Sequence, residues 1–136
     1  MRIKLDNYAY MPTRAHPTDA GLDLRSPVDY IIPSKGAAWI NTGVHVELPE
    51  GTVGLLKSKS GLNVKHGITS EGVIDVGYTG SIVVKLYNLS DTVYEVRKGD
   101  KITQLLVMPC LFPECEEVDS LDDTERGSDG FGSTGR

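Results

Sequence analysis

Apolar and polar residues alternate over short stretches of this chain, with the period of a half-buried β-strand. In "TGVHVELPE", Val44, Val46 and Leu48 alternate with His45 and Glu47, which predicts a strand with one face on the core. "TVYEV" (92–96) and "KITQLLVMP" (101–109) are predicted to be further strands, separated by the turn "RKGD". Weaker strand signals occur in "RIKL" (2–5) and "DYIIP" (29–33).

The stretch "SIVVKLYNL" is apolar on both faces of an expected strand. Ile82, Val84 and Leu86 lie on one side, and Val83 and Tyr87 lie on the other. This pattern predicts a strand that is covered twice, either by a second sheet or by a neighbouring subunit.

Glycine and proline recur throughout, so no apolar-periodic segment is long enough to predict a long helix. A short helix is predicted in "SGLNVKHG" (60–67), with Ser60 as its N-cap. Many short strands with regular turns favour an all-β sandwich or barrel, and 136 residues favour a single domain.

The C-terminal part changes composition. Residues 114–125 carry seven carboxylates and are predicted to be a solvated linker. The last residues, "RGSDGFGSTGR", are too rich in glycine to build a core. We therefore expect a β-barrel core over residues 1–113, an acidic linker over 114–125 and a flexible glycine-rich arm over 126–136.

Charge and targeting signals narrow the class of protein. A formal net charge of -5 argues against a nucleic-acid groove, but it is compatible with a local site for a small anion. No apolar run approaches the length of a membrane span, and the first residues lack a signal-peptide apolar region. A cytoplasmic protein is expected, with Cys110 and Cys115 as free, buried thiols.

Asp75 is the first candidate for chemistry. It follows two apolar residues in "EGVIDVGYTGS" (71–81), where Gly77 and Gly80 suit a tight hairpin. A partly desolvated carboxylate beside a cleft can deprotonate a water molecule. The alternative is a turn aspartate that bonds its own backbone.

"LKSKSGLNV" (56–64) is a candidate phosphate site. Lys57 and Lys59 flank serines, and Ser60 and Gly61 stand where a helix can begin. A helix N-terminus with a hydroxyl and a nearby cation binds phosphate well, whereas the alternative is an exposed turn with ordinary lysines.

Other polar residues give weaker signals. In "HPTDAGLDLRS", Asp19 resembles a turn residue, and Asp23 either points outward from a strand or faces a polar site. Gln104 is the uncharged polar residue of "ITQLLVM" and either contacts a ligand or points outward. The three histidines show no metal-ligand spacing and are predicted to be surface or turn residues: His16, His45 and His66.

The glycine-rich arm itself could bind a nucleotide. Glycine N–H groups can form an anion-binding nest, Ser133 and Thr134 add hydroxyls, Arg126 can grip phosphate, and Phe131 can stack on a base. The alternative is a disordered end without a function.

Five motifs occur in order across nearly the whole chain: "AGLDL", "KSGL", "GVIDVGYTG", "GDKITQLL" and "RGSDGFGSTG". In these motifs the chain resembles the trimeric deoxyuridine triphosphatases. The resemblance implies a jelly-roll-like subunit and a homotrimer with sites at the subunit interfaces, each closed by an arm. It also implies hydrolysis of dUTP to dUMP and pyrophosphate, with Mg²⁺ bound through the triphosphate.

The resemblance also implies roles for single residues. Asp75 aligns with the water-activating carboxylate, Tyr78 with the residue under the deoxyribose, and Asp23 with a carboxylate that touches the metal's water shell. The uracil edge would be read by Thr69 and the backbone around Gly72, Val73 and Ile74. Phosphate contacts align with Lys59, Ser60, Gly61 and Gln104, and the closing arm with Arg126, Phe131, Gly132, Ser133 and Thr134.

Two positions depart from the family pattern. Lys59 stands where an arginine is usual, so its phosphate contact is not bidentate. Thr69 stands where many members have asparagine, which leaves more of the uracil recognition to the backbone.

Two other functions are compatible with the sequence. One is a dCTP deaminase-like enzyme of the same superfamily. The other is a dUTP-sensing regulatory protein that binds a protein partner.

Overall fold

The computed structural model of the chain describes residues 1–130. Within them, no helix is long and apolar enough to cross a membrane. The elements along the chain are β1 (Arg2–Leu5), β2 (Leu22–Arg25), β3 (Tyr30–Ile32), β4 (Ala37–Asn41), β5 (Val44–Glu47), β6 (Thr52–Lys57), α1 (Ser60–His66), β7 (Ile68–Ile74), β8 (Val83–Asn88), β9 (Tyr94–Val96) and β10 (Lys101–Pro109).

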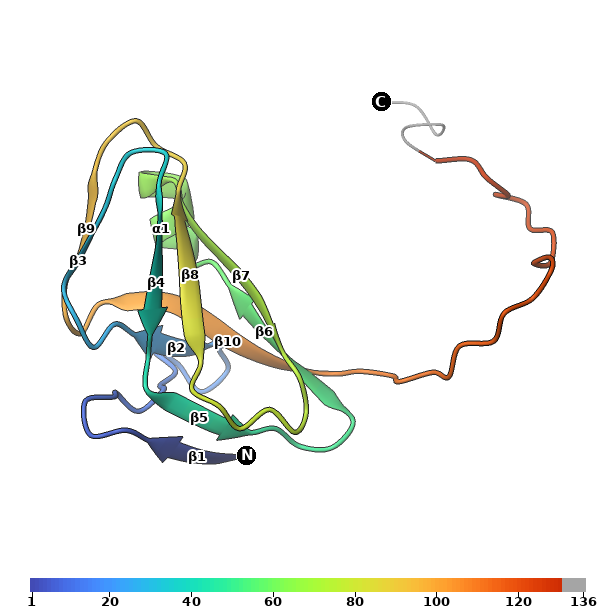
Figure 1. Cartoon of the computed structure of the whole chain (residues 1–136), viewed down its shortest axis with the longest axis horizontal. Helices are drawn as coiled ribbons and strands as arrows, with labels where there is room; N and C mark the ends of the chain where they lie inside the picture. The colour runs from blue at the N-terminus through green and yellow to red at the C-terminus, as the bar shows by residue number, and fades with distance from the viewer. Residues whose placement is uncertain (131–136) are drawn as a thin grey trace.

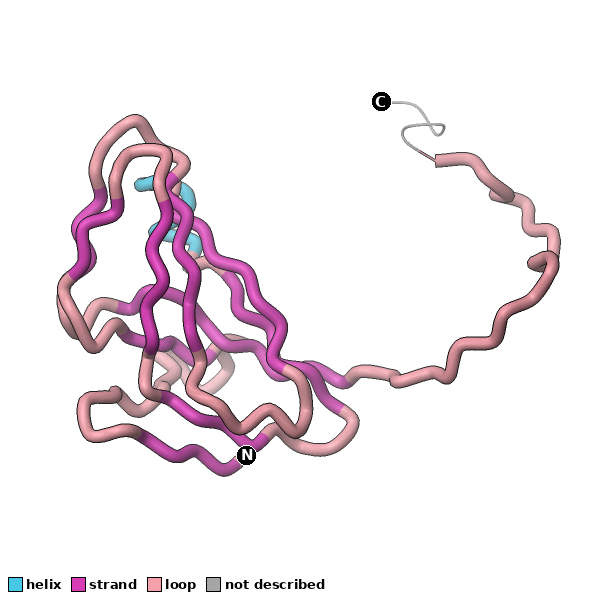
Figure 2. Tube along the Cα trace, viewed as in Figure 1, coloured by secondary structure: helices cyan, strands magenta, loops and turns pink. Residues whose placement is uncertain are grey.

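One curled sheet forms the body of the fold. Its strand order is β2-β10-β6-β7-β8-β4, and two small sheets, β1-β5 and β3-β9, complete the subunit (Figures 1 and 2). Strand β7 makes the corner, because residues 68–70 pair with β8 whereas residues 71–74 pair with β6. The predicted all-β, jelly-roll-like fold is confirmed.

Inward-facing apolar residues of the curled sheet and of β5 fill the core. Burial follows the alternation seen in the sequence, as in β8, where the even-numbered residues are buried. The fully buried side chains include Leu24, Ile32, Ile40, Val44, Leu56, Ile68, Ile82, Val84, Leu86, Val96, Ile102 and Leu105.

The outer face of β4 and β8 remains open in the single chain. Val83 is 48% exposed, Tyr87 is 38% exposed and Trp39 is 62% exposed. The Lys85 ammonium group lies over the rings of Trp39 and Tyr87, 4.6 and 4.7 Å from their centroids. The sequence predicted that both faces of β8 are covered. Residues 1–130 of the same chain cover only its inner face.

Several local predictions need correction. Lys59, not Ser60, is the N-cap of α1, because the Lys59 backbone is extended while its carbonyl accepts the N–H of Asn63 at 2.9 Å. His45 is not a surface or turn residue, since it lies on β5 with its side chain 18% exposed. No strand was predicted for β4, β6 or β7, and β2 was considered only as one alternative for the place of Asp23.

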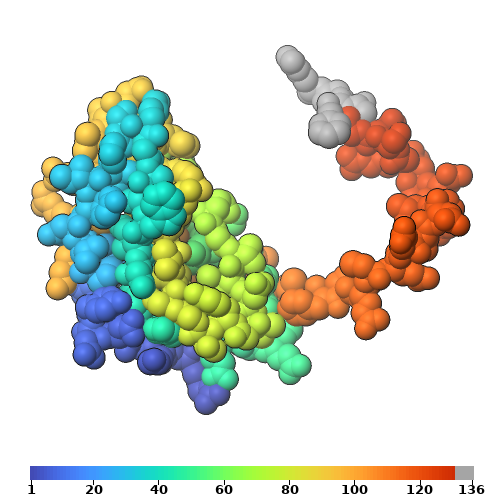
Figure 3. All heavy atoms as spheres, viewed as in Figure 1, coloured from blue at the N-terminus to red at the C-terminus, as the bar shows by residue number. Residues whose placement is uncertain are grey.

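The cysteines are free, as expected, but they are not buried. Cys115 is exposed and Cys110 is half-buried. Both cysteines follow β10, which ends at Pro109, so they lie outside the barrel. Cys110 remains half-buried beside the barrel, and its N–H donates to the Gly51 carbonyl at 2.9 Å. Residues 114–125 are exposed, and Figure 3 shows this segment running away from the body.

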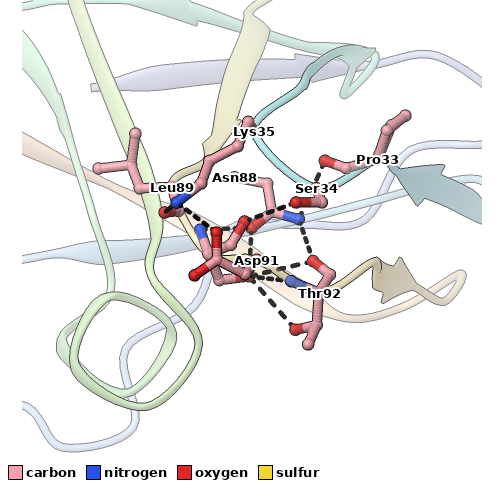
Figure 4. A network of polar contacts seen from close by, with 8 residues as sticks. Pro33, Ser34, Lys35, Asn88, Leu89, Asp91 and Thr92 are labelled. Atoms are coloured by element: carbon pink, nitrogen blue, oxygen red, sulfur yellow. Dashed lines mark hydrogen bonds and ion pairs between the residues drawn. The ribbon is translucent and has the colours of Figure 1, made fainter.

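The amide of Asn88 joins two loops at one end of the barrel (Figure 4). The residue is 1% exposed, and its Nδ2 donates to the carbonyls of Ile32, Pro33 and Thr92 at 3.2, 3.1 and 2.8 Å. Its Oδ1 accepts from the N–H and the hydroxyl of Ser90 at 3.0 and 2.7 Å. Every polar atom of this buried side chain therefore has a partner.

We predict that Asn88→Asp destabilises the fold by at least roughly 1–3 kcal/mol, because it turns a donor toward three carbonyl oxygens into an acceptor. The measurement is thermal unfolding at matched protein concentration. Asn7→Asp, at an exposed turn position, is the control and should unfold like the parent. Equal melting temperatures for the two variants would contradict the prediction.

Candidate functional site

Four polar residues lie in one row across four neighbouring strands. Asp23 of β2 is directly opposite Gln104 of β10, Gln104 is opposite Lys57 of β6, and Lys57 is opposite Glu71 of β7. Directly opposite residues share one face of a sheet, so these side chains form a continuous polar row. Lys57 and Glu71 also form an exposed ion pair, with Nζ and Oε2 2.9 Å apart.

A β-bulge brings Lys101 to the same face. Lys101 and Gln104 are three residues apart, a spacing that places side chains on opposite faces of a regular strand. The register of β10 against β2 shifts between Lys101 and Thr103, and Ile102 and Thr103 are both buried. This extra residue re-aims Lys101 toward Asp23.

Asp23 is a buried carboxylate between two ammonium groups. Its side chain is 7% exposed, Lys59 Nζ bonds to Oδ1, and Lys101 Nζ lies 2.7 Å from Oδ2. Burial alone would raise the pKa of Asp23, but the hydrogen bonds and charges of Lys101 and Lys59 outweigh burial and lower that pKa. Two cations against one anion leave a local positive charge, which suits an anionic ligand.

Buried hydroxyls fix the segment that carries Lys59. The Ser70 N–H donates to Ser58 Oγ at 2.9 Å, and Ser58 Oγ donates to the Ser70 carbonyl at 3.2 Å. Ser70 Oγ lies 2.7 Å from Thr103 Oγ1, which donates to the Lys57 carbonyl at 3.0 Å. The start of α1 is thereby tied to β7 and β10.

Gln104 depends on the glycine that precedes β2. Its Nε2 donates to the Ser58 carbonyl at 3.1 Å. A Cβ atom on Gly21 would lie 2.2 Å from Gln104 Oε1, so a side chain there would force the amide away. The glycine of "AGLDL" is thus required by close approach.

Asp75 begins a turn that projects from the end of β7. The Tyr78 N–H donates to the Asp75 carbonyl at 3.1 Å, and Gly77 has a φ of 90°, as in a type II turn. The Asp75 carboxylate is exposed in the single chain, so the partial desolvation expected for it is not present there. The Tyr78 hydroxyl donates to the Ser81 carbonyl at 3.1 Å, and its ring lies over Gly80.

Strands β7 and β8 diverge before they reach this turn. Their pairing runs from Ile68↔Asn88 through Thr69↔Tyr87 and ends at Ser70↔Leu86. Beyond that point β7 continues along β6, while the Ile82 N–H donates to the Val44 carbonyl of β5 at 2.8 Å. The side of residues 72–74 that faces away from β6 is therefore not paired with β8.

The structure brings together only part of the predicted site. Asp23, Lys59 and Gln104 meet, and Ser60 and Gly61 are exposed in the first turn of α1 beside Lys59. Arg126 is exposed, and its Nε donates to the Asp129 carbonyl at 3.0 Å. The remaining arm residues lie outside the described part of the chain: Phe131, Gly132, Ser133 and Thr134.

Sequence reasoning missed Lys101, Gly21 and the pairing of Lys57 with Glu71. The sequence carries no signal for Lys101, because the bulge that turns it toward Asp23 appears only in the strand register. Gly21 and Glu71 carry no signal without the strand register, because their partners are distant in sequence.

A family model for dUTPase matches residues 7–135. This chain is 46% identical to the deoxyuridine 5'-triphosphate nucleotidohydrolase of rat, over 98% of its length. It is 47% identical to the protein of that name from Arabidopsis thaliana, over 97% of its length. The human mitochondrial protein of that name is 46% identical over 98% of this chain. The chain spans 66% of the rat protein, 53% of the human protein and 80% of the plant protein.

Solved structures from bacteriophages are similar over most of the chain. A variant of the Staphylococcus bacteriophage 80alpha dUTPase with dUpNHpp is 33% identical, with a TM-score of 0.93, over 99% of this chain and 98% of that one. A variant of the dUTPase of phage phi11 of S. aureus, described as coordinating a structural Mg(II) ion, is 31% identical, with a TM-score of 0.81, over 88% and 96%.

We predict that Asp23→Asn lowers stability at neutral pH and that the loss disappears in acid. The pKa of Asp23 is lower in the folded than in the unfolded chain, so its stabilisation is complete above the ordinary value of 3.8 and is lost as the pH falls through the folded value. Denaturant midpoints measured from neutral to acidic pH test this. Asp91→Asn, with a side chain that is 90% exposed, should change little at any pH. A gap between parent and Asp23→Asn that stays constant in acid would contradict the prediction.

Proposed function

This chain belongs to the dUTPase family, and from that premise we propose that it hydrolyses dUTP to dUMP and pyrophosphate. The observation that carries the proposal is the divergence of β7 and β8 next to Asp75. Peptide groups that lack a strand partner need another one. The edge of uracil offers both a donor and acceptors, so it can replace the missing strand along Gly72, Val73 and Ile74.

The same loop can select the base and the sugar. Uracil lacks the methyl group of thymine, so a narrow gap between strands admits it and rejects dTTP. Thr69 lies in the part of β7 that pairs with β8, and it adds a hydroxyl near the base. The Tyr78 ring packs under the deoxyribose and leaves no room for a 2′-hydroxyl.

The triphosphate binds at the polar row. Lys59 and Lys101 give the surplus positive charge, and the Gln104 amide, the Ser60 hydroxyl and the backbone at Gly61 supply hydrogen bonds. Phosphoryl transfer depends mainly on positioning and on neutralising charge, which this arrangement provides. Lysine in place of arginine at position 59 keeps the charge but gives a point contact.

Asp75 is the general base of the proposed reaction. Its carboxylate takes a proton from a water molecule while the water oxygen attacks the α-phosphorus. The bond from that phosphorus to the bridging oxygen breaks, pyrophosphate leaves with the bonding electrons, and dUMP retains the new oxygen. The exposure of Asp75 in the single chain leaves the carboxylate free for this role.

Magnesium fits this site as an ion carried by the triphosphate. The described residues contain no group of three histidine, cysteine, aspartate or glutamate side chains that could hold a metal. Both oxygens of Asp23 already face lysines, so this carboxylate would reach the metal through a water molecule. Bound to the phosphates, Mg²⁺ supplies neutralising charge.

We further propose a homotrimer in which neighbouring chains complete each site. The outer face of β4 and β8 exposes Trp39, Val83 and Tyr87. On the other half of the sheet, Leu106, Leu55 and Val73 lie directly opposite one another on the face of the polar row. Two outward apolar surfaces on one subunit favour association. The cytoplasmic location stays a prediction.

The arm is proposed to be a lid over the nucleotide. Arg126 would add charge at the terminal phosphates, and Phe131 would stack on uracil, which is worth on the order of 1–3 kcal/mol at other base-stacking sites. Gly132, Ser133 and Thr134 would contact the phosphates. Residues 111–129 are exposed, and they carry the arm away from the barrel. We propose that this length lets the arm serve a neighbouring subunit.

We predict that the purified protein with Mg²⁺ releases pyrophosphate from dUTP and much less from dTTP, dCTP, dATP, dGTP or UTP. Pyrophosphate release across all these nucleotides is the measurement.

Asp75→Asn keeps the shape of the side chain and should lower kcat by roughly 10²–10⁴ while dUTP still binds.

Three results would oppose the proposal in different ways. No release from dUTP by the parent would reject the activity. Near-normal kcat for pure Asp75→Asn would keep the activity and reject the base. Release of ammonia from dCTP would identify a deaminase instead.

A second prediction concerns the arm and the trimer. Removing residues 126–136 should leave a folded trimer, because residues 126–129 are exposed and Gly130 is not part of the core. It should nevertheless abolish most turnover, since a closed lid excludes water and clamps the triphosphate. Light scattering, melting temperature and dUTP turnover are compared with those of the full chain. Unchanged turnover would reject the lid, and an active monomer would reject the trimer.

A further inference from the structure

We propose that His45 is a positioning residue that holds the loop of residues 75–81 in its productive place, an inference that rests on the function proposed above. His45 stands on β5, outside the polar row and outside the turn that carries Asp75. Its imidazole Nδ1 lies 2.8 Å from the carbonyl oxygen of Thr79, the residue that follows Tyr78.

Few contacts attach this loop to the body of the fold. Two hydrogen bonds stay within the loop: the Tyr78 N–H donates to the Asp75 carbonyl, and the Tyr78 hydroxyl donates to the Ser81 carbonyl. Among the described residues, two side chains of other strands hold it, His45 at Thr79 and Asn41 at the Ser81 hydroxyl. Backbone pairing resumes only at Ile82. Ile74, paired with Gly54, holds the loop on the Asp75 side. On the other side, His45 is the attachment nearest to Tyr78 along the loop.

The imidazole is itself held from its other side. A carbonyl oxygen only accepts, so Nδ1 must carry the hydrogen that bonds to Thr79. Nε2 is buried and lies 3.3 Å from Oδ1 of Asp6. The Asp6 backbone is fixed at the end of β1, because its N–H donates to the Gly43 carbonyl at 2.9 Å. Nε2 makes no hydrogen bond, but the nearby Asp6 carboxylate borders the ring on the side opposite Thr79. Asp6 therefore helps to orient the imidazole that contacts the loop.

The loop needs such an anchor because its own backbone is permissive. Gly77 adopts a positive φ, and residues 75–79 are exposed in the single chain. A shift of about 1 Å in a catalytic group can lower the rate about 10²-fold. Loss of the anchor should therefore affect kcat more than it affects folding.

The decisive pair of variants is His45→Leu and His45→Asn. Leucine removes both ring nitrogens at similar volume, whereas the asparagine amide nitrogen stands near the place of Nδ1 and can still donate to Thr79. We expect His45→Leu to lower kcat by about 10- to 100-fold with a smaller change in KM. We expect His45→Asn to retain kcat within about threefold, since the loop contact survives. Glu47→Gln, on the same strand and face and paired with exposed Arg2, is the matched control and should behave like the parent.

Asp6→Asn tests the orienting carboxylate. Alone it should lower kcat less than His45→Leu does, and combined with His45→Leu it should cause no further loss, because both act through one contact. Full additivity of the two losses would overturn the role given to Asp6. Parent-like kcat for His45→Leu, or equal loss in the leucine and asparagine variants, would overturn the proposal for His45.

Amide hydrogen exchange without nucleotide separates this proposal from the proposed activity. Exchange in residues 75–81 should be faster in His45→Leu than in the parent and in Glu47→Gln, while exchange in β10 stays unchanged. This result would support the anchor even if the parent did not hydrolyse dUTP. Unchanged exchange in the loop would overturn it even if the parent did.

Discussion

Strand β7 pairs with β8 over residues 68–70 and with β6 over residues 71–74, and much of the structure depends on this change of partner. The change curls the sheet and closes the core. It also separates two strands that are neighbours in sequence, and a turn with an exposed carboxylate spans the opening. The same corner thus makes the barrel and leaves one side of residues 72–74 unpaired with β8.

A second constraint is the buried charge of Asp23. An isolated carboxylate at this depth would be costly, and two ammonium groups from different elements compensate for it. One of them reaches Asp23 because of a bulge in β10, and the other because hydroxyls of three segments fix the start of α1. The positive region next to the opening is therefore a consequence of how the sheet satisfies one acid.

The sequence was sufficient for the fold class and for strands such as β5, with its clear alternation, and β10. It also singled out Asp23 and Gln104, which the register places opposite each other. It was insufficient where tertiary register decides. Three features depend on contacts between residues far apart in the chain. They are the approach of Gln104 to Gly21, the bulge before Thr103 in the pairing with β2, and the half-buried position of His45 beside Asp6. For Asp75 the apolar neighbours predicted partial desolvation, whereas the turn after Ile74 leaves the residue exposed in the single chain.

Trp39 is the only tryptophan of the chain, and it stands on the open face of β4 with the Lys85 ammonium group over its ring. Indole emission responds to nearby charge and to water. Any surface that covers this face must remove water from the ring and confine the lysine against it. Trp39 is therefore an intrinsic fluorophore on a face that association of subunits would cover. A shift of its emission wavelength would report such association without an added label.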